Sequence, residues 1–167
     1  MRLAIRSVFF TITLPGFVVI LIPYLILRIS GPITFQDFSP IQIFSVILWL
    51  ISVFVLLYCI WSFAKYGEGT LAPVDPPKHL VITAPYRYTR NPMYLAVFSA
   101  LLSEAIFSNS SGILIFSLIA LTLFHLFVLF YEEPKLKAEF GASYEEYIKS
   151  VPRWGFRTTP YKLDRAT

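Results

Sequence analysis

The chain has 167 residues, of which 56 % are apolar and 14 % are charged, whereas about 25 % of the residues of an ordinary soluble domain are charged. Its mean hydropathy is +0.66. Because a soluble fold of this size needs a charged surface, the composition excludes an intrinsically disordered chain, a disulfide-linked secreted module and an ordinary cytosolic enzyme. We therefore expect an integral membrane protein without a nucleic-acid partner, although the formal net charge is +4.

Long uncharged stretches predict four membrane-spanning helices. Ser7 to Leu27 contains 21 uncharged residues and Phe38 to Ala64 contains 27, and about 20 residues of helix cross the apolar core of a bilayer. Between residues 91 and 131 the only charge is Glu104, and the polar break from Ser108 to Gly112 divides this stretch in two. The predicted helices lie at about 8–27, 42–64, 93–107 and 113–131.

Prolines predict a bend in the first of these helices. Pro15, Gly16 and Pro23 fall within it, and membrane helices tolerate such residues where neighbouring groups satisfy the freed backbone atoms. The apolar stretch is long for a signal peptide and no small-residue cleavage pattern follows it, so we expect a retained helix.

The basic residues predict the orientation in the membrane. With four helices, both termini lie on one side, together with the loop between the second and third helices. That side holds 13 Lys and Arg residues and the other side holds 1. Because basic residues accumulate on the cytoplasmic side of membrane proteins, we expect both termini and this loop in the cytoplasm.

The expected architecture is a single membrane-embedded all-α domain over residues 1–167. Its four parts are the first two helices (1–64), a proline-rich extended loop (65–92), a helical hairpin (93–131) and a cytoplasmic tail (132–167).

Within the tail, apolar residues recur at helical spacing and Gly141 suits the end of a helix. This pattern predicts two short amphipathic helices, at about 134–140 and 144–150, on the membrane surface or beneath the bundle.

The hairpin is expected to bring opposite charges together at its cytoplasmic end. Arg90 and Asn91 precede its first helix, and the pair Glu132 and Glu133 follows its second. Asn91 suits an N-cap and Pro92 suits the first helical position, so free backbone N–H groups and the helix dipole would add to the charge of Arg90. A zwitterion, such as the amino-acid end of a cofactor, would satisfy both halves of such a site.

Simpler interpretations of the same residues stay open at this point. Arg90 and the two glutamates are equally consistent with an interfacial ion pair where helices leave the bilayer. Glu104 is either a functional group within the membrane or a residue at the outer rim. His125 is expected to be a hydrogen-bonded interior histidine, because no second His or Cys has the spacing of a metal ligand.

Two separated motifs of the chain belong together. The first comprises Gly69 to Pro73, Leu80-Val81 and the run from Pro85 to Tyr94. The second begins at Glu132-Glu133-Pro134-Lys135-Leu136 and continues through Phe140-Gly141, Tyr144, Tyr147 and Val151-Pro152-Arg153-Trp154. Over residues 67–157, in order and spacing, these motifs resemble the isoprenylcysteine carboxyl methyltransferase and phospholipid methyltransferase superfamily.

The resemblance implies a membrane methyltransferase that uses S-adenosyl-L-methionine, held between the last two helices and the tail. It implies that Glu132 faces the methyl acceptor and that Arg90 shapes the site as a second catalytic residue. By motif position, the cofactor-binding residues would be Lys78, His79, Leu80, Val81, Tyr86, Asn91, Pro92, Met93, Tyr94 and Glu133. The implied partners are the bilayer and a lipophilic or prenylated acceptor.

The chain departs from the family at two positions. The family often has His where this chain has Asn91, which cannot titrate. The eukaryotic carboxyl methyltransferases carry an arginine one helical turn before the two glutamates, and here that residue is Val128. This difference argues against a prenylcysteine carboxylate as the acceptor.

Two other functions remain compatible with the sequence. One is a nicotinamide-dependent sterol-type membrane reductase, whose C-terminal segment carries similar motifs, although this chain is short for it. The other is a non-enzymatic four-helix transporter subunit or assembly protein with Glu104 as its coupling group.

Overall fold

The computed structural model describes residues 15–30, 39–67 and 80–162, and all regular elements in these ranges are helical. This confirms the expected all-α class for the described residues. In chain order the elements are η1 (Phe17–Leu21), α2 (Ile22–Ser30), α3 (Pro40–Ser62), η2 (Phe63–Gly67), η3 (Ala84–Arg87), α4 (Pro92–Ser108), α5 (Ser111–Phe127), η4 (Val128–Glu132) and α6 (Glu133–Ser150).

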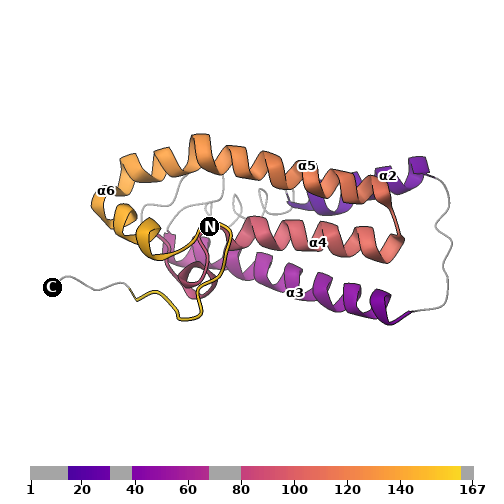
Figure 1. Cartoon of the computed structure of the whole chain (residues 1–167), viewed down its shortest axis with the longest axis horizontal. Coiled ribbons are helices and arrows are strands. Elements are labelled where there is room, and N and C mark those ends of the chain that lie inside the picture. Colours follow the sequence, from indigo (N-terminus) through magenta and orange to yellow (C-terminus); the bar gives the residue numbers. More distant parts are fainter. Residues whose placement is uncertain (1–14, 31–38, 68–79, 163–167) are drawn as a thin grey trace.

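Helix α4 lies at the centre of the bundle. It packs against α3 on one side and α5 on the other, and the three helices run alongside one another (Figure 1). Its buried face carries small residues, including Ala96, Ala100 and Ala105, which let helix backbones approach closely. The predicted antiparallel hairpin of α4 and α5 is thus confirmed, with a turn at Asn109 and Ser110.

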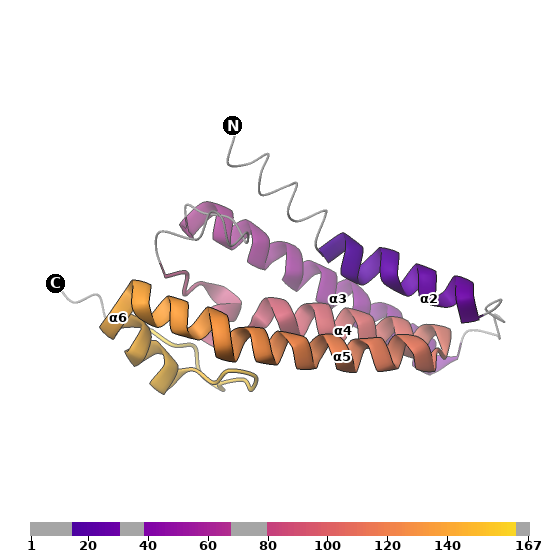
Figure 2. The ribbon, with the colours of Figure 1, turned by 90° about the horizontal axis from the view of Figure 1, so that it is seen from above.

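Helix α2 covers a different side of the bundle, where it packs against α5 (Figure 2). The contact is close because the second residue of α5 is a glycine. A Cβ atom on Gly112 would lie only 2.8 Å from Cγ2 of Ile26. The predicted first helix, 8–27, reaches into residues 8–14, which lie outside the described residues.

The polarity of the bundle is typical of membrane proteins. Large apolar side chains point outward, with Phe54 69 % exposed and Phe130 72 % exposed. Small polar side chains are buried instead, including Ser45, Ser52 and Ser117. The hydroxyl of Ser52, for example, donates a hydrogen bond to the carbonyl of Leu48 in its own helix. Such a surface is stable against lipid and unfavourable in water.

Two of the four predicted spans are long and apolar enough, by length and composition, to cross a membrane. They are Pro40–Ser62 and the apolar part of the helix Ser111–Ser150. Helix α4 has 17 residues, and the described part of the first helix, Phe17–Ser30, is also shorter than a full span.

The structure corrects the predicted end of the fourth helix at residue 131. The helix continues from α5 through η4 into α6 without a break (Figure 1). Pro134 does not end it, because the π turn η4 lies directly before this proline. There the N–H of Glu133 bonds to the carbonyl of Val128, five residues back, and the wider turn makes room for the proline ring.

The same arrangement is found in the first helix, for which prolines predicted a bend. The π turn η1 ends two residues before Pro23, and the N–H of Ile22 bonds to the carbonyl of Phe17. The π turns η1 and η4 each come just before a proline, and in both cases the helix continues past that proline.

The tail reverses direction at Gly141 and returns to the bundle. Gly141 has φ 50° and ψ −125° within α6, a backbone conformation that residues with a Cβ rarely adopt. The two predicted tail helices are confirmed as the two parts of α6 on either side of this kink.

Beyond α6, backbone hydrogen bonds pair the tail with the segment before α4. They join Arg90 N to Pro152 O, Arg157 N to Tyr88 O and Tyr161 N to Arg87 O, each at 2.9 Å. The segment before α4 also contains the 3₁₀ turn η3, so the predicted loop 65–92 is not extended throughout, and its residues 68–79 lie outside the described residues.

Replacing Gly141 by Ala should destabilise the protein by about 1–3 kcal/mol, because the new Cβ would be strained at a positive φ. The control is Gly16→Ala, at φ −64° and ψ −38° with open space around the new Cβ, which should stabilise the helix by about 0.4–1 kcal/mol. Thermal unfolding in detergent measures both changes. Equal effects at the two positions would contradict the conformational explanation.

Candidate active site

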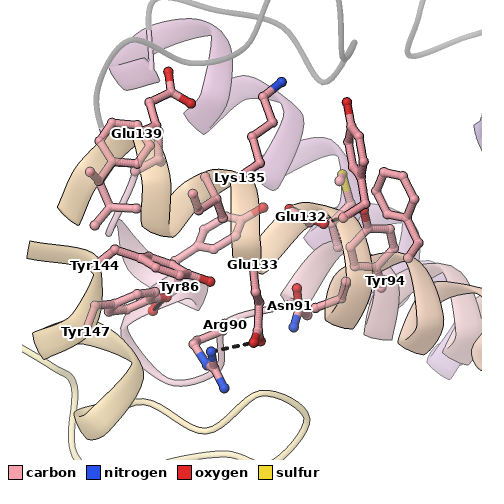
Figure 3. A pocket seen from close by; sticks show the side chains of 18 of the residues that line it. Tyr86, Arg90, Asn91, Tyr94, Glu132, Glu133, Lys135, Glu139, Tyr144 and Tyr147 are labelled. Carbon is pink, nitrogen blue, oxygen red and sulfur yellow. Dashed lines mark hydrogen bonds and ion pairs between the residues drawn. The ribbon is translucent and has the colours of Figure 1, made fainter.

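A pocket lies where the start of α4, the turn η4, helix α6 and the end of α3 meet (Figure 3). Its volume is about 140 Å³, far above the roughly 10–15 Å³ that a single water needs. It is lined by Phe63, Leu80, Val81, Tyr86, Arg90, Asn91, Met93, Tyr94, Phe127, Val128, Tyr131, Glu132, Glu133, Lys135, Leu136, Glu139, Phe140, Tyr144 and Tyr147.

The structure brings most of the predicted site residues to this pocket. Nine of them line it, namely Leu80, Val81, Tyr86, Arg90, Asn91, Met93, Tyr94, Glu132 and Glu133. Pro92 is buried at the first position of α4 and is not among the lining residues. Lys78 and His79 lie outside the described residues.

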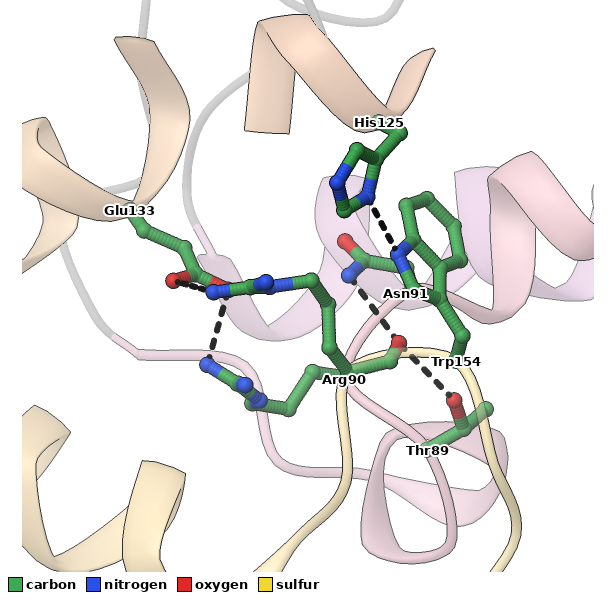
Figure 4. Close-up of polar contacts among 7 residues, drawn as sticks. Thr89, Arg90, Asn91, His125, Glu133 and Trp154 are labelled. Carbon is green, nitrogen blue, oxygen red and sulfur yellow. Dashed lines mark hydrogen bonds and ion pairs between the residues drawn. The ribbon is translucent and has the colours of Figure 1, made fainter. Parts of the chain in front are cut away.

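Glu133 forms the centre of a charged cluster with Arg90 and Arg153, which we call the Glu133 cluster (Figure 4). Nη1 of Arg90 donates to Oε1 of Glu133 at 2.8 Å. The guanidinium of Arg153 donates to both carboxylate oxygens, from Nε at 2.7 Å and from Nη2 at 2.8 Å. These hydrogen bonds raise the pKa of Arg153, and they join three distant parts of the chain.

The ion pair of Arg90 with Glu133 is the one that the simpler interpretation of these residues expected. The pair does not use every hydrogen-bond donor of Arg90, however. The side chain of Arg90 is only 11 % exposed. Its Nε is buried and has no hydrogen-bond partner within the described part of the chain. A buried donor without a partner is costly, so an anionic or carbonyl group of a ligand would be stabilised at this atom.

Asn91 does not cap α4 as predicted, although it occupies the N-cap position. Its Nδ2 donates instead to the carbonyl of Arg153 at 3.1 Å, and Oγ1 of Thr89 approaches the same oxygen at 3.4 Å. The amide is therefore used to hold the tail, which leaves the first N–H groups of α4 without a side-chain cap.

Glu132 points in a different direction from Glu133, towards Tyr94 of α4 (Figure 3). Its Oε2 accepts a hydrogen bond of 2.8 Å from the hydroxyl of Tyr94. The ring of Tyr94 is itself held between Phe124, at 4.9 Å between ring centroids, and Trp154, at 6.5 Å. This packing fixes the orientation of the carboxylate at the edge of the pocket.

An aromatic wall closes the inner side of the pocket. Tyr86 packs edge-on against Phe63 at 5.4 Å, and its backbone carbonyl accepts a 2.6 Å hydrogen bond from the hydroxyl of Tyr147. Burial, reinforced by the nearby Cys59, raises the pKa of Tyr86. Its hydroxyl therefore stays protonated at physiological pH and can donate a hydrogen bond.

Two residues with open roles lie away from the pocket. Nδ1 of His125 accepts a 2.9 Å hydrogen bond from Nε1 of Trp154, which confirms the predicted hydrogen bond, although the side chain is half-buried and not interior. Oε1 of Glu104 accepts one of 2.8 Å from Trp49, near the opposite end of α4. The described residues contain no cluster of three or more His, Cys, Asp or Glu that could hold a metal ion.

The tail contributes residues that the sequence did not single out as site residues. Arg153 and Trp154 lie within one of the quoted motifs, but nothing in their spacing shows that they contact Glu133 and His125. Tyr144 and Tyr147 are spaced like the apolar side of a helix, and their position in the pocket depends on the reversal at Gly141.

Replacing Glu133 by Gln should destabilise the protein by about 3 kcal/mol, because it leaves two largely buried arginines without their counter-charge. The matched control is Glu145→Gln in the same helix. Glu145 pairs with Lys137 at 2.9 Å, but these side chains are 43 % and 59 % exposed, so we expect little or no change in stability. Urea or thermal unfolding measures both; similar losses would show that the Glu133 cluster does not stabilise the fold.

Comparison with known families agrees with this geometry. The family model described as phospholipid methyltransferase matches residues 40–143, more than half of the chain, and this range includes the start of α4, both glutamates and the first part of α6. No curated protein and no solved structure matched the chain. The family is one of membrane methyltransferases, in keeping with the apolar surface of the bundle. The chain belongs to the phospholipid methyltransferase family.

Proposed function

We propose that the protein transfers a methyl group from S-adenosyl-L-methionine to a lipid-like acceptor at the cytoplasmic face of the membrane. The proposal rests on one observation: the same pocket has a charged side and an apolar side. Arg90, Glu132 and Glu133 form its charged side, and Phe63, Phe127 and Val128 belong to its apolar side. A charged cofactor and an apolar acceptor require both sides within a single site.

The residues of the charged side fit the polar end of this cofactor. Nε of Arg90 is a buried donor without a partner in the described residues, and the nearby start of α4 lacks a side-chain cap; both favour a carboxylate. The carboxylate of Glu132, whose hydrogen bond comes from the neutral hydroxyl of Tyr94, favours a nearby positive centre of the same cofactor. When bound, the cofactor supplies a methyl group on a sulfonium for in-line displacement, so the protein contributes mainly positioning and charge.

Glu132 is the residue we propose to face the acceptor. Tyr94 orients its carboxylate through the 2.8 Å hydrogen bond. For an amine acceptor, Glu132 removes the proton that methylation releases. For a carboxylate acceptor no base is needed, and Glu132 would instead repel it.

Val128 supports an acceptor without a carboxylate. This side chain is 1 % exposed and lines the pocket at the position where the resembling carboxyl methyltransferases carry an arginine. Arg90 is an arginine that does line the pocket, but it is bound to Glu133. We therefore rank other lipid-like acceptors above a prenylcysteine carboxylate, and a screen of labelled cofactor against lipid extracts and prenylcysteine analogues compares the two classes directly.

The proposed placement has four helices in the bilayer and both termini in the cytoplasm. The excess of basic residues on one side supports it. So does the position of the pocket, because the charged residues at the start of α4 and the end of η4 lie at the same end of the bundle (Figure 1). A polar cofactor would then arrive from the cytoplasm and the acceptor from the membrane.

The purified protein should bind S-adenosyl-L-methionine or S-adenosylhomocysteine, and titration calorimetry in detergent or nanodiscs measures this. Arg90→Ala should weaken the affinity at least tenfold, because a charge-assisted hydrogen bond is lost. Its control is Arg28→Ala, in α2 and away from the pocket, which should leave the affinity unchanged. Binding of NADPH instead of either cofactor form would favour the reductase and overturn the proposal.

Turnover should depend on Glu132 and less strongly on the residue that orients it. We expect Glu132→Gln to abolish methyl transfer and Tyr94→Phe to lower kcat about tenfold or more, since each changes the charge or the position of one carboxylate. Glu104→Gln is the control, because Glu104 lies far from the pocket and should be dispensable for methyl transfer. Labelled methyl groups in extracted lipid report the rate; full activity of Glu132→Gln would show that the site is misplaced.

A further inference from the structure

The tail loop, residues 152–157, lies along the side of the bundle, beside its apolar part. Trp154 donates to His125 at 2.9 Å and packs against Tyr94. His125 precedes Glu132 by seven residues, which corresponds to about 10 Å along a helix. The loop therefore reaches past the level of the charged residues, towards the part of α5 that we place in the bilayer (Figure 2).

Both ends of the tail loop are fixed. At its start, the carbonyl of Pro152 accepts from Arg90 N and the guanidinium of Arg153 binds Glu133. At its end, Arg157 N donates to the carbonyl of Tyr88, and Nη1 of Arg157 donates to the carbonyl of Ser150 at 2.8 Å. The segment between these contacts therefore has a defined position.

Phe156 belongs to this fixed loop, directly before Arg157, and is 71 % exposed. It is the one large apolar side chain exposed in the tail over the described residues 133–162. The tail buries its other aromatic rings efficiently, since Tyr144 and Tyr147 are each 3 % exposed. The exposure of Phe156 is thus a local exception, and it resembles that of Phe130, at 72 %, on the outer surface of η4.

We propose that Phe156 inserts into the interfacial region of the bilayer and that the tail loop is a membrane-contacting element of the protein. The occupant is the lipid around the bundle, because Trp154, two residues before Phe156, holds the loop at the level of His125 on α5, and the outer side chains of α5 are exposed and apolar. Trp, Phe and Leu side chains form the face that interfacial elements bury at the boundary between headgroups and acyl chains. The inference rests on the proposed membrane placement of the bundle and not on the identity of the acceptor.

Bilayer contact at Phe156 has a consequence for the pocket. Arg153, three residues earlier, holds Glu133 and accepts from Asn91. A loop held by lipid on one side and by the bundle on the other keeps these contacts in place, so the membrane itself helps to order the charged side of the pocket.

The test places a nitroxide label at single cysteines in lipid nanodiscs and compares its accessibility to oxygen, which enriches in lipid, and to a water-soluble nickel chelate. The background is Cys59→Ala, which removes the buried native thiol. The probe is Phe156→Cys. Phe130→Cys on η4 is the lipid reference, and Ala142→Cys, exposed directly after the kink, is the water reference.

We expect the labels at 156 and 130 to be more accessible to oxygen, and the label at 142 to be more accessible to nickel. Nickel accessibility at 156 equal to that at 142, with 130 in lipid, would overturn the inference and leave the membrane placement intact. Low accessibility of 156 to both reagents would indicate a protein partner and would also overturn it. Nickel accessibility at 130 would reject the membrane placement and the inference together.

Discussion

The rest of the site depends on how Glu133 is neutralised. Its carboxylate is bound by Arg90, before α4, and by Arg153, in the tail, so one charge connects segments that are 43 and 20 residues away from it. An isolated charge at this depth would be unfavourable. With two arginines around it, the cluster determines where α6 and the tail lie relative to the central helix, and thereby creates the walls of the pocket.

The glutamates differ in function because their surroundings differ. Glu133 is saturated with cationic donors and serves mainly to assemble the site. Glu132 accepts from the neutral hydroxyl of Tyr94 and lines the pocket together with the apolar residues Val128 and Phe127. A carboxylate with this much unused acceptor capacity at the border of an apolar cavity is suited to contact an incoming substrate. Of these two adjacent glutamates, Glu133 therefore stabilises the structure of the site, and Glu132 is available for its chemistry.

The sequence predicted the parts of the fold that depend on hydropathy and local turns. The break from Ser108 to Gly112 located the hairpin, and the hairpin correctly predicted that Arg90 would lie near the glutamates. The role of Arg153 could not be predicted in this way, because it requires the tail to reverse at Gly141 and to pair with the segment before α4. Asn91 was assigned to the wrong bond for a related reason: a capping residue identified from local sequence can be recruited by a distant carbonyl, here that of Arg153.

The π turn η4 has a consequence for how the site tolerates changes in chain length. Adjacent residues of an α-helix project about 100° apart, and a wider turn brings them closer together, which helps Glu132 and Glu133 to line one cavity. A π turn holds one residue more than the α-helical turn that it replaces, so removing a single residue from Val128–Glu132 would allow regular α-helical hydrogen bonding while the helix after it keeps its direction. The change would fall within the turn itself: adjacent residues would again project about 100° apart, and the room for the ring of Pro134 would be lost. One extra residue in this turn therefore serves both the relative position of the two glutamates and the passage of the helix through a proline.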